Sequence, residues 1–78
     1  MNVDGIRYLL NHVELAYESA LSANEPKEVC AQAMRTAAKQ MILHQRIPRD
    51  TFGYAEAIMK CDDPIDFVAR AEVLRSYP

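Results

Sequence analysis

Three internal prolines divide this 78-residue chain into four segments, and this division constrains the fold more than any other feature of the sequence. Proline fixes its own φ and has no backbone N–H, so a helix accepts it in the first turn but not in the interior. Pro26, Pro48 and Pro64 therefore mark places where a helix starts or is interrupted. Within each segment, apolar residues recur at three- and four-residue steps, which is typical of an amphipathic helix.

The apolar rows predict which side of each helix faces the core. In the first helix the row is Ile6, Leu10, Val13, Tyr17, Ala20 and Leu21, widened by Leu9 and Ala16. In the second helix, which runs to about Gln45, it is Cys30, Ala33, Met34, Ala37, Ala38, Met41 and Ile42. The two shorter helices have the rows Phe52, Ala55, Ile58, Met59 and Phe67, Val68, Ala71, Leu74.

Polar residues before each row predict where the helices start. Asp4 and Asn24 are candidate N-caps of the first and second helices, and Asp50 or Thr51 caps the third. The sequence Asp62-Asp63-Pro64 is the clearest start signal, because it combines a capping carboxylate with a proline at the first helical position.

The connections between these segments are two to six residues long, and short loops between helices favour antiparallel neighbours. Only two glycines are present, too few turn-formers for a many-stranded β fold. We therefore predict an all-α fold, a small antiparallel bundle of four helices (two longer, two short), in one domain over residues 1–78. The alanines of the second helix would let a neighbouring helix approach closely.

Composition indicates a cytoplasmic protein. No apolar run approaches the ~20 residues of a membrane span, and residues 1–5 lack the pattern of a secretory signal. Cys30 and Cys61 fit no metal or redox spacing, so we expect two reduced thiols. A net charge of −2 gives no overall attraction to nucleic acid or to an anionic membrane.

Basic residues are concentrated in the middle of the chain, between two acidic segments. A candidate stripe that could contact a polyanion or an acidic partner is formed by Arg35, Lys39, Arg46 and Arg49. The alternative is a solvated helix face that pairs with the acidic segments. No aromatic residues interleave these bases as a single-strand platform would require, which makes nucleic-acid binding the less favoured interpretation.

No catalytic, cofactor or metal site is predicted. His12, His44, Cys30 and Cys61 include no local pair with metal-ligand or nucleophile spacing. The acidic run Asp62, Asp63 and Asp66 lacks the glycine of a calcium loop and is explained by helix capping.

Apolar residues that fall outside the inner rows form a candidate interface: Tyr8, Leu15, Leu43, Ile65 and Val73. The core of so short a chain contributes only a few kcal/mol of net stability, so self-association is expected.

The sequence thus favours a non-enzymatic helical module, of the size seen in phage or plasmid accessory proteins. It would act as a regulator, adaptor or inhibitor by binding another protein, and we expect a homodimer. The second hypothesis is a small nucleic-acid-associated regulator that uses the basic stripe at 35–49. An enzyme is third, because so short a chain seldom encloses a substrate pocket.

Overall fold

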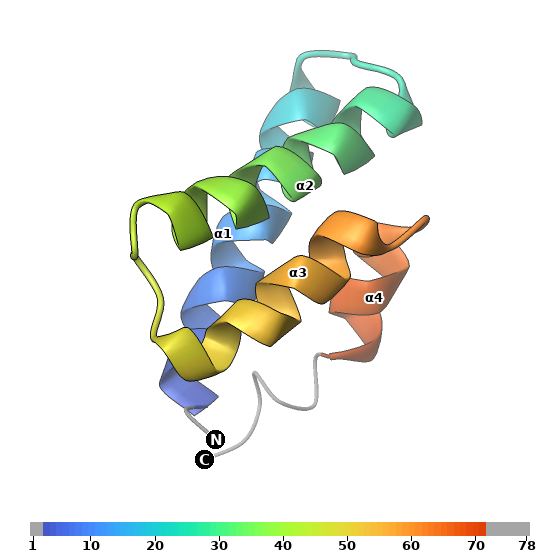
Figure 1. The fold of residues 1–78 in the computed structure, drawn as a ribbon. Coiled ribbons are helices and arrows are strands. Elements are labelled where there is room, and N and C mark those ends of the chain that lie inside the picture. Colours follow the sequence, from blue (N-terminus) through green and yellow to red (C-terminus); the bar gives the residue numbers. More distant parts are fainter. Residues whose placement is uncertain (1–2, 72–78) are drawn as a thin grey trace.

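The structure is a computed structural model and describes residues 3–71 of the chain. Within this range it contains four α-helices and one 3₁₀ turn (Figure 1). The elements are α1 (Val3–Ser22), α2 (Lys27–Leu43), η1 (Arg49–Thr51), α3 (Phe52–Lys60) and α4 (Pro64–Arg70). The prediction of a small all-α bundle with two longer and two shorter helices is confirmed.

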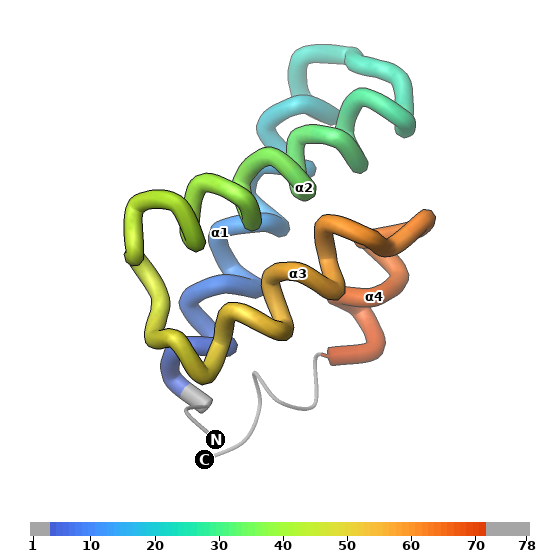
Figure 2. The backbone as a smooth tube through the Cα atoms, in the orientation of Figure 1, coloured from blue at the N-terminus to red at the C-terminus, as the bar shows by residue number. Residues whose placement is uncertain are grey.

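The tube in Figure 2 shows how the helices are arranged. α2 returns alongside α1 as the second arm of a helical hairpin, and α1 packs mainly against it. α3 then runs back along α2, and α4 turns across the end of α3 to reach both α1 and α2. The hairpin end that joins α1 to α2 projects beyond α3 and α4 (Figure 1).

The core lies between the predicted inner rows of the four helices. Its fully buried side chains include Leu9 and Leu10 of α1, Met34 of α2, Ile58 of α3 and Val68 of α4. Two members of the predicted inner rows depart from this pattern. Ala33 is half-buried and lines an open hollow on α2 instead of the core. Leu21 is 53% exposed, because it lies in the last turn of α1, where the hairpin projects beyond the elements that cover the rest of the row (Figure 1). Leu74 lies outside the described residues.

Two predicted helix starts are wrong. Asp4 lies in the first turn of α1, which begins at Val3, and Pro26 occupies the N-cap position of α2 in place of Asn24. The predicted position of the third start is confirmed, because Thr51 is the N-cap residue of α3; it is buried at the end of the 3₁₀ turn, and its side chain makes no capping hydrogen bond.

Asn24 instead ends the first helix. Its φ of 62° is left-handed, the Asn24 N–H donates to the carbonyl of Leu21, and the Glu25 N–H donates to the carbonyl of Ala20. These two bonds form a Schellman motif, which satisfies carbonyls at a helix C-terminus. The second helix ends in the same way, because Gln45 has a φ of 49° and the Arg46 N–H donates to the carbonyl of Met41.

The predicted start of α4 is confirmed. The Asp63 carboxylate accepts a hydrogen bond of 3.2 Å from the backbone N–H of Asp66, and Pro64 is the first helical residue. An edge-to-face contact between Tyr54 and Phe67, with ring centroids 5.5 Å apart, joins α4 to α3. This cap and this ring pair fix the short fourth helix against the bundle.

Candidate functional site

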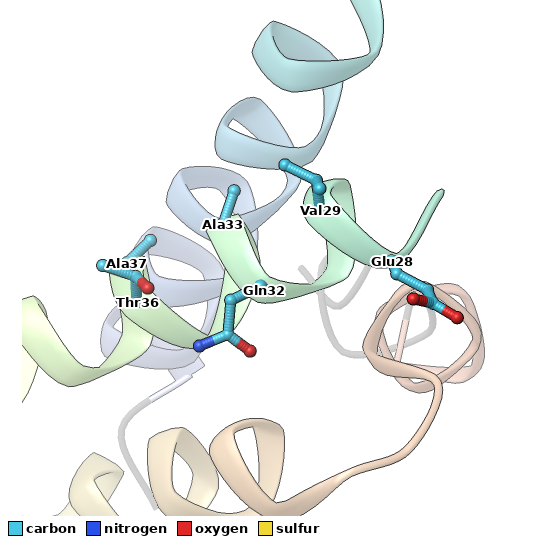
Figure 3. A pocket seen from close by; sticks show the side chains of 6 residues that line it. All are labelled: Glu28, Val29, Gln32, Ala33, Thr36 and Ala37. Carbon is cyan, nitrogen blue, oxygen red and sulfur yellow. The ribbon is translucent and has the colours of Figure 1, made fainter. Parts of the chain in front are cut away.

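The outer face of α2 is the candidate functional surface. It carries an open hollow of about 590 Å³ with a mostly apolar lining (Figure 3). The residues that line it all belong to α2: Glu28, Val29, Gln32, Ala33, Thr36 and Ala37. Lys39 follows on the same side of the helix, and we call these seven residues the α2 outer face.

Two parallel rows of side chains form this hollow. Val29, Ala33 and Ala37 lie along one edge at four-residue steps, and Glu28 and Gln32 lie along the other (Figure 3). Ala33 and Ala37 are half-buried, so the floor of the hollow is close to the helix backbone. The face is therefore a flat, small-residue surface with polar groups on one edge.

The large exposed apolar side chains of the described residues lie on the hairpin. They are Leu15 and Leu21 on α1, which are 61% and 53% exposed, and Val29 and Leu43 on α2, which are 44% and 60% exposed. The described parts of α3 and α4 contribute none. Exposed apolar groups that share one supersecondary unit are more informative than scattered ones.

The structure divides the predicted apolar interface. Leu15 and Leu43 are exposed, whereas Tyr8 and Ile65 are half-buried and pack against the core. The Tyr8 ring also contacts the His12 ring in a tilted arrangement, with ring centroids 4.5 Å apart. Val73 lies outside the described residues. The sequence prediction missed Leu21 and Val29, and the four-residue spacing of Val29 from Ala33 is the signal that could have found the latter.

Arg35 differs from the other members of the basic stripe. Its Nη2 donates to the carbonyl oxygens of Cys61 at 2.8 Å and Asp62 at 3.2 Å, and its Nε donates to Cys61 at 3.1 Å. A further bond of 3.2 Å joins Nη1 to the side chain of Gln32. The guanidinium is thus engaged with the connection between α3 and α4.

The remaining members, Lys39, Arg46 and Arg49, are exposed. Lys39 lies on α2, Arg46 on the connection that follows it, and Arg49 in the 3₁₀ turn. The basic stripe that remains available to a partner therefore has three cations spread over two elements and a loop.

A second hollow of about 380 Å³ lies between α1, α2 and the start of α4. It is lined by Tyr17, Lys27, Glu28, Ala31, Asp62, Asp63 and Ile65. The Asp63 carboxylate is already used as the cap of α4, and Lys27 offsets part of the negative charge. This hollow is smaller and more polar than the α2 outer face.

Residues with chemical reactivity do not gather in the described part of the chain. Cys30 is buried and its thiol lies 3.6 Å from the carbonyl oxygen of Glu25, while Cys61 is half-buried. His44 is bonded to Gln40 at 2.8 Å on the exposed side of α2. Over residues 3–71 no three His, Cys, Asp or Glu side chains are placed to hold a metal ion, and no helix there could cross a membrane.

Comparison of the chain with protein-family models, curated proteins and solved structures finds no match.

Proposed function

We propose that this protein is a non-enzymatic helical module of the cytoplasm that binds another protein and acts as a regulator, adaptor or inhibitor. The observation that supports this proposal is the concentration of exposed apolar side chains on the α1–α2 hairpin, next to the hollow of the α2 outer face. Binding energy at protein interfaces resides in a few apolar or aromatic anchors that become buried. Val29 and Leu43 are the anchors we assign on α2.

Affinity capture from host lysate tests this proposal. The wild-type chain should retain a defined protein after nuclease treatment, and the Val29→Asp and Leu43→Asp variants should lose it. Both positions are exposed, so the substitutions leave the core intact. Ala57→Asp, at an exposed position on α3, is the matched control and should retain the partner. Capture that all four chains share equally would contradict a docking site on α2.

The second candidate function is nucleic-acid association, which is favoured by the exposure of Lys39, Arg46 and Arg49. Three phosphate contacts would give a log–log salt slope of about −3, so the affinity would collapse by physiological salt. We expect no binding to random DNA or RNA at ~0.15 M salt in a gel-shift titration. Micromolar binding that is lost on charge reversal of these three residues would establish this function instead. Arg35 must stay unchanged in that variant, because its reversal would also disturb the fold.

A further inference from the structure

We infer that the α2 outer face is the docking site for a second copy of this chain, whose own α2 lies antiparallel across it. This inference rests on the proposed function, because it assigns an occupant to the same face. It is carried by the charge pattern of the face, its small residues and the positions of its exposed apolar side chains.

The small residues determine how closely a helix can approach. Thr36 lies near the middle of the face, and the small residues Ala33 and Ala37 line one edge of the hollow (Figure 3). The distance between packed helix axes depends on the side chains at their contact, and alanines permit the shortest distances. The edge that Ala33 and Ala37 form therefore lets a second helix backbone approach closely.

The charges of the face are complementary to themselves. Glu28 and Lys39 are eleven positions apart, which is three helical turns or about 16 Å, so they lie on the same side of α2. A two-fold axis perpendicular to α2, midway between them, brings Glu28 of each copy opposite Lys39 of the other. The pair forms twice because a two-fold interface repeats each contact. A parallel arrangement would instead oppose like charges.

The same register explains the apolar side chains at the two ends of the face. With Lys39 opposite Glu28, Leu43 reaches the level of Asn24 in the second copy. Val29 lies inside the contact, one residue from Glu28. Val29 and Leu43, the two large exposed apolar side chains of α2, thus lie within the contact and at its end.

The size of the face predicts a weak dimer. The 17 residues of α2 extend over about 25 Å, and one helix pair of this length buries less than the roughly 1,200 Å² of a stable interface. We therefore expect a dissociation constant on the order of 10 μM. Exposed ion pairs contribute modestly, so their effect should be visible at low salt and lost at high salt.

The first experiment tests the location of the interface by sedimentation equilibrium of the full chain. Thr36→Arg places a long charged side chain at the centre of the face, at an exposed position that does not enter the core. We expect it to abolish dimerisation. Ala57→Arg makes the same change on the exposed side of α3 and should leave the dimer unchanged. Circular dichroism verifies that both variants are folded.

The second experiment tests the antiparallel register by charge exchange. The Glu28→Lys chain has lysine at both positions and the Lys39→Glu chain has glutamate at both, so each alone opposes like charges. We expect each single variant to dimerise about tenfold more weakly than the wild type at low salt. An equimolar mixture of the two should form a heterodimer of near wild-type affinity, because every pair is then of opposite sign. The Glu28→Lys/Lys39→Glu double variant should likewise recover the homodimer.

Two results would overturn the inference. One is a wild-type chain that remains monomeric at a concentration tenfold above the expected dissociation constant. The other is a dimer that neither Thr36→Arg nor the charge reversals weaken. The proposed function fails separately: a chain that dimerises as described but captures no other protein contradicts that function alone. A monomeric chain that captures a protein through Val29 and Leu43 contradicts only the second-copy docking.

Discussion

The guanidinium of Arg35 in α2 holds the carbonyl oxygen of Cys61, which follows the last residue of α3, with two hydrogen bonds of 2.8 and 3.1 Å. The last carbonyls of a helix have no partner within the helix, and a connection between two short helices has few other means to satisfy them. One charged side chain thus joins the middle of α2 to the connection between α3 and α4.

Removal of this contact should destabilise the protein. We expect Arg35→Ala to lower the free energy of unfolding by about 1.5–2 kcal/mol, the lower part of the range for hydrogen bonds to a charged group, because the site is only partly buried. Urea titration followed by circular dichroism measures the change. Lys39→Ala, one turn further along the exposed side, should change it by less than about 0.5 kcal/mol. An equal loss of unfolding free energy in the two variants would show that the hydrogen bonds of Arg35 do not stabilise the fold.

The two glycines should respond to alanine with opposite signs. A Cβ on Gly5 would lie 2.8 Å from Thr51 Oγ1 and 2.9 Å from Pro48 Cδ, which is too close for either atom to remain in place. Gly5→Ala should therefore destabilise the protein by about 1–3 kcal/mol, less the gain in helix propensity. A Cβ on Gly53 meets nothing within 4 Å, so Gly53→Ala should stabilise it by about 0.4–1 kcal/mol. Thermal melts of the two variants side by side provide the comparison.

The left-handed residue that ends α2 is a site for stabilisation. Gln45 has a φ of 49°, a conformation that costs a residue with a Cβ about 1 kcal/mol and glycine almost nothing. Gln45→Gly should raise the melting temperature. Asn24→Gly, at the equivalent position after α1, should raise it less, because asparagine tolerates this region better. A lower melting temperature for Gln45→Gly would contradict the Schellman geometry at this helix end.

The methionines should differ according to their burial. Met41 is 2% exposed, and Met41→Ala should cost about 2–5 kcal/mol, enough to unfold a domain of this size. Met34, which is fully buried, should behave in the same way. Met59 is half-buried, so Met59→Ala should cost less and leave a measurable melting transition. An unchanged melting temperature for Met41→Ala would show that Met41 does not belong to the core.

The thiols should be reduced and differ in reactivity. Cys30 is buried and Cys61 half-buried, so iodoacetamide should label Cys61 in the folded chain and Cys30 only after unfolding. Replacement of both by alanine should leave the oligomeric state unchanged. A loss of two hydrogens in the mass of the purified protein, reversed by reductant, would show that the thiols are oxidised.

What the sequence determined by itself is the set of elements and their inner sides. Pro64 and Asp63 act within one helical turn, and the start of α4 was predicted correctly because both signals are local. The three- and four-residue spacing placed Met34 and Ile58 on inner faces for the same reason. The exposed Leu15 and Leu43 also followed from spacing, since they lie off the apolar rows.

Only the tertiary structure decided which side chains meet across elements. Arg35 belonged to a basic stripe by spacing, but its partner is 26 residues away and became a neighbour only when α3 packed on α2. Gly5 and Thr51 are brought together by the return of the chain after α2, which also buries Ile47 of the predicted break. Leu21 lies on the side of α1 that the spacing predicts, but no other helix packs over it, because the end of the hairpin extends past α3 and α4 (Figure 1). The side of a helix on which a residue lies depends on a few consecutive residues, whereas the burial of that residue depends on where the other helices end.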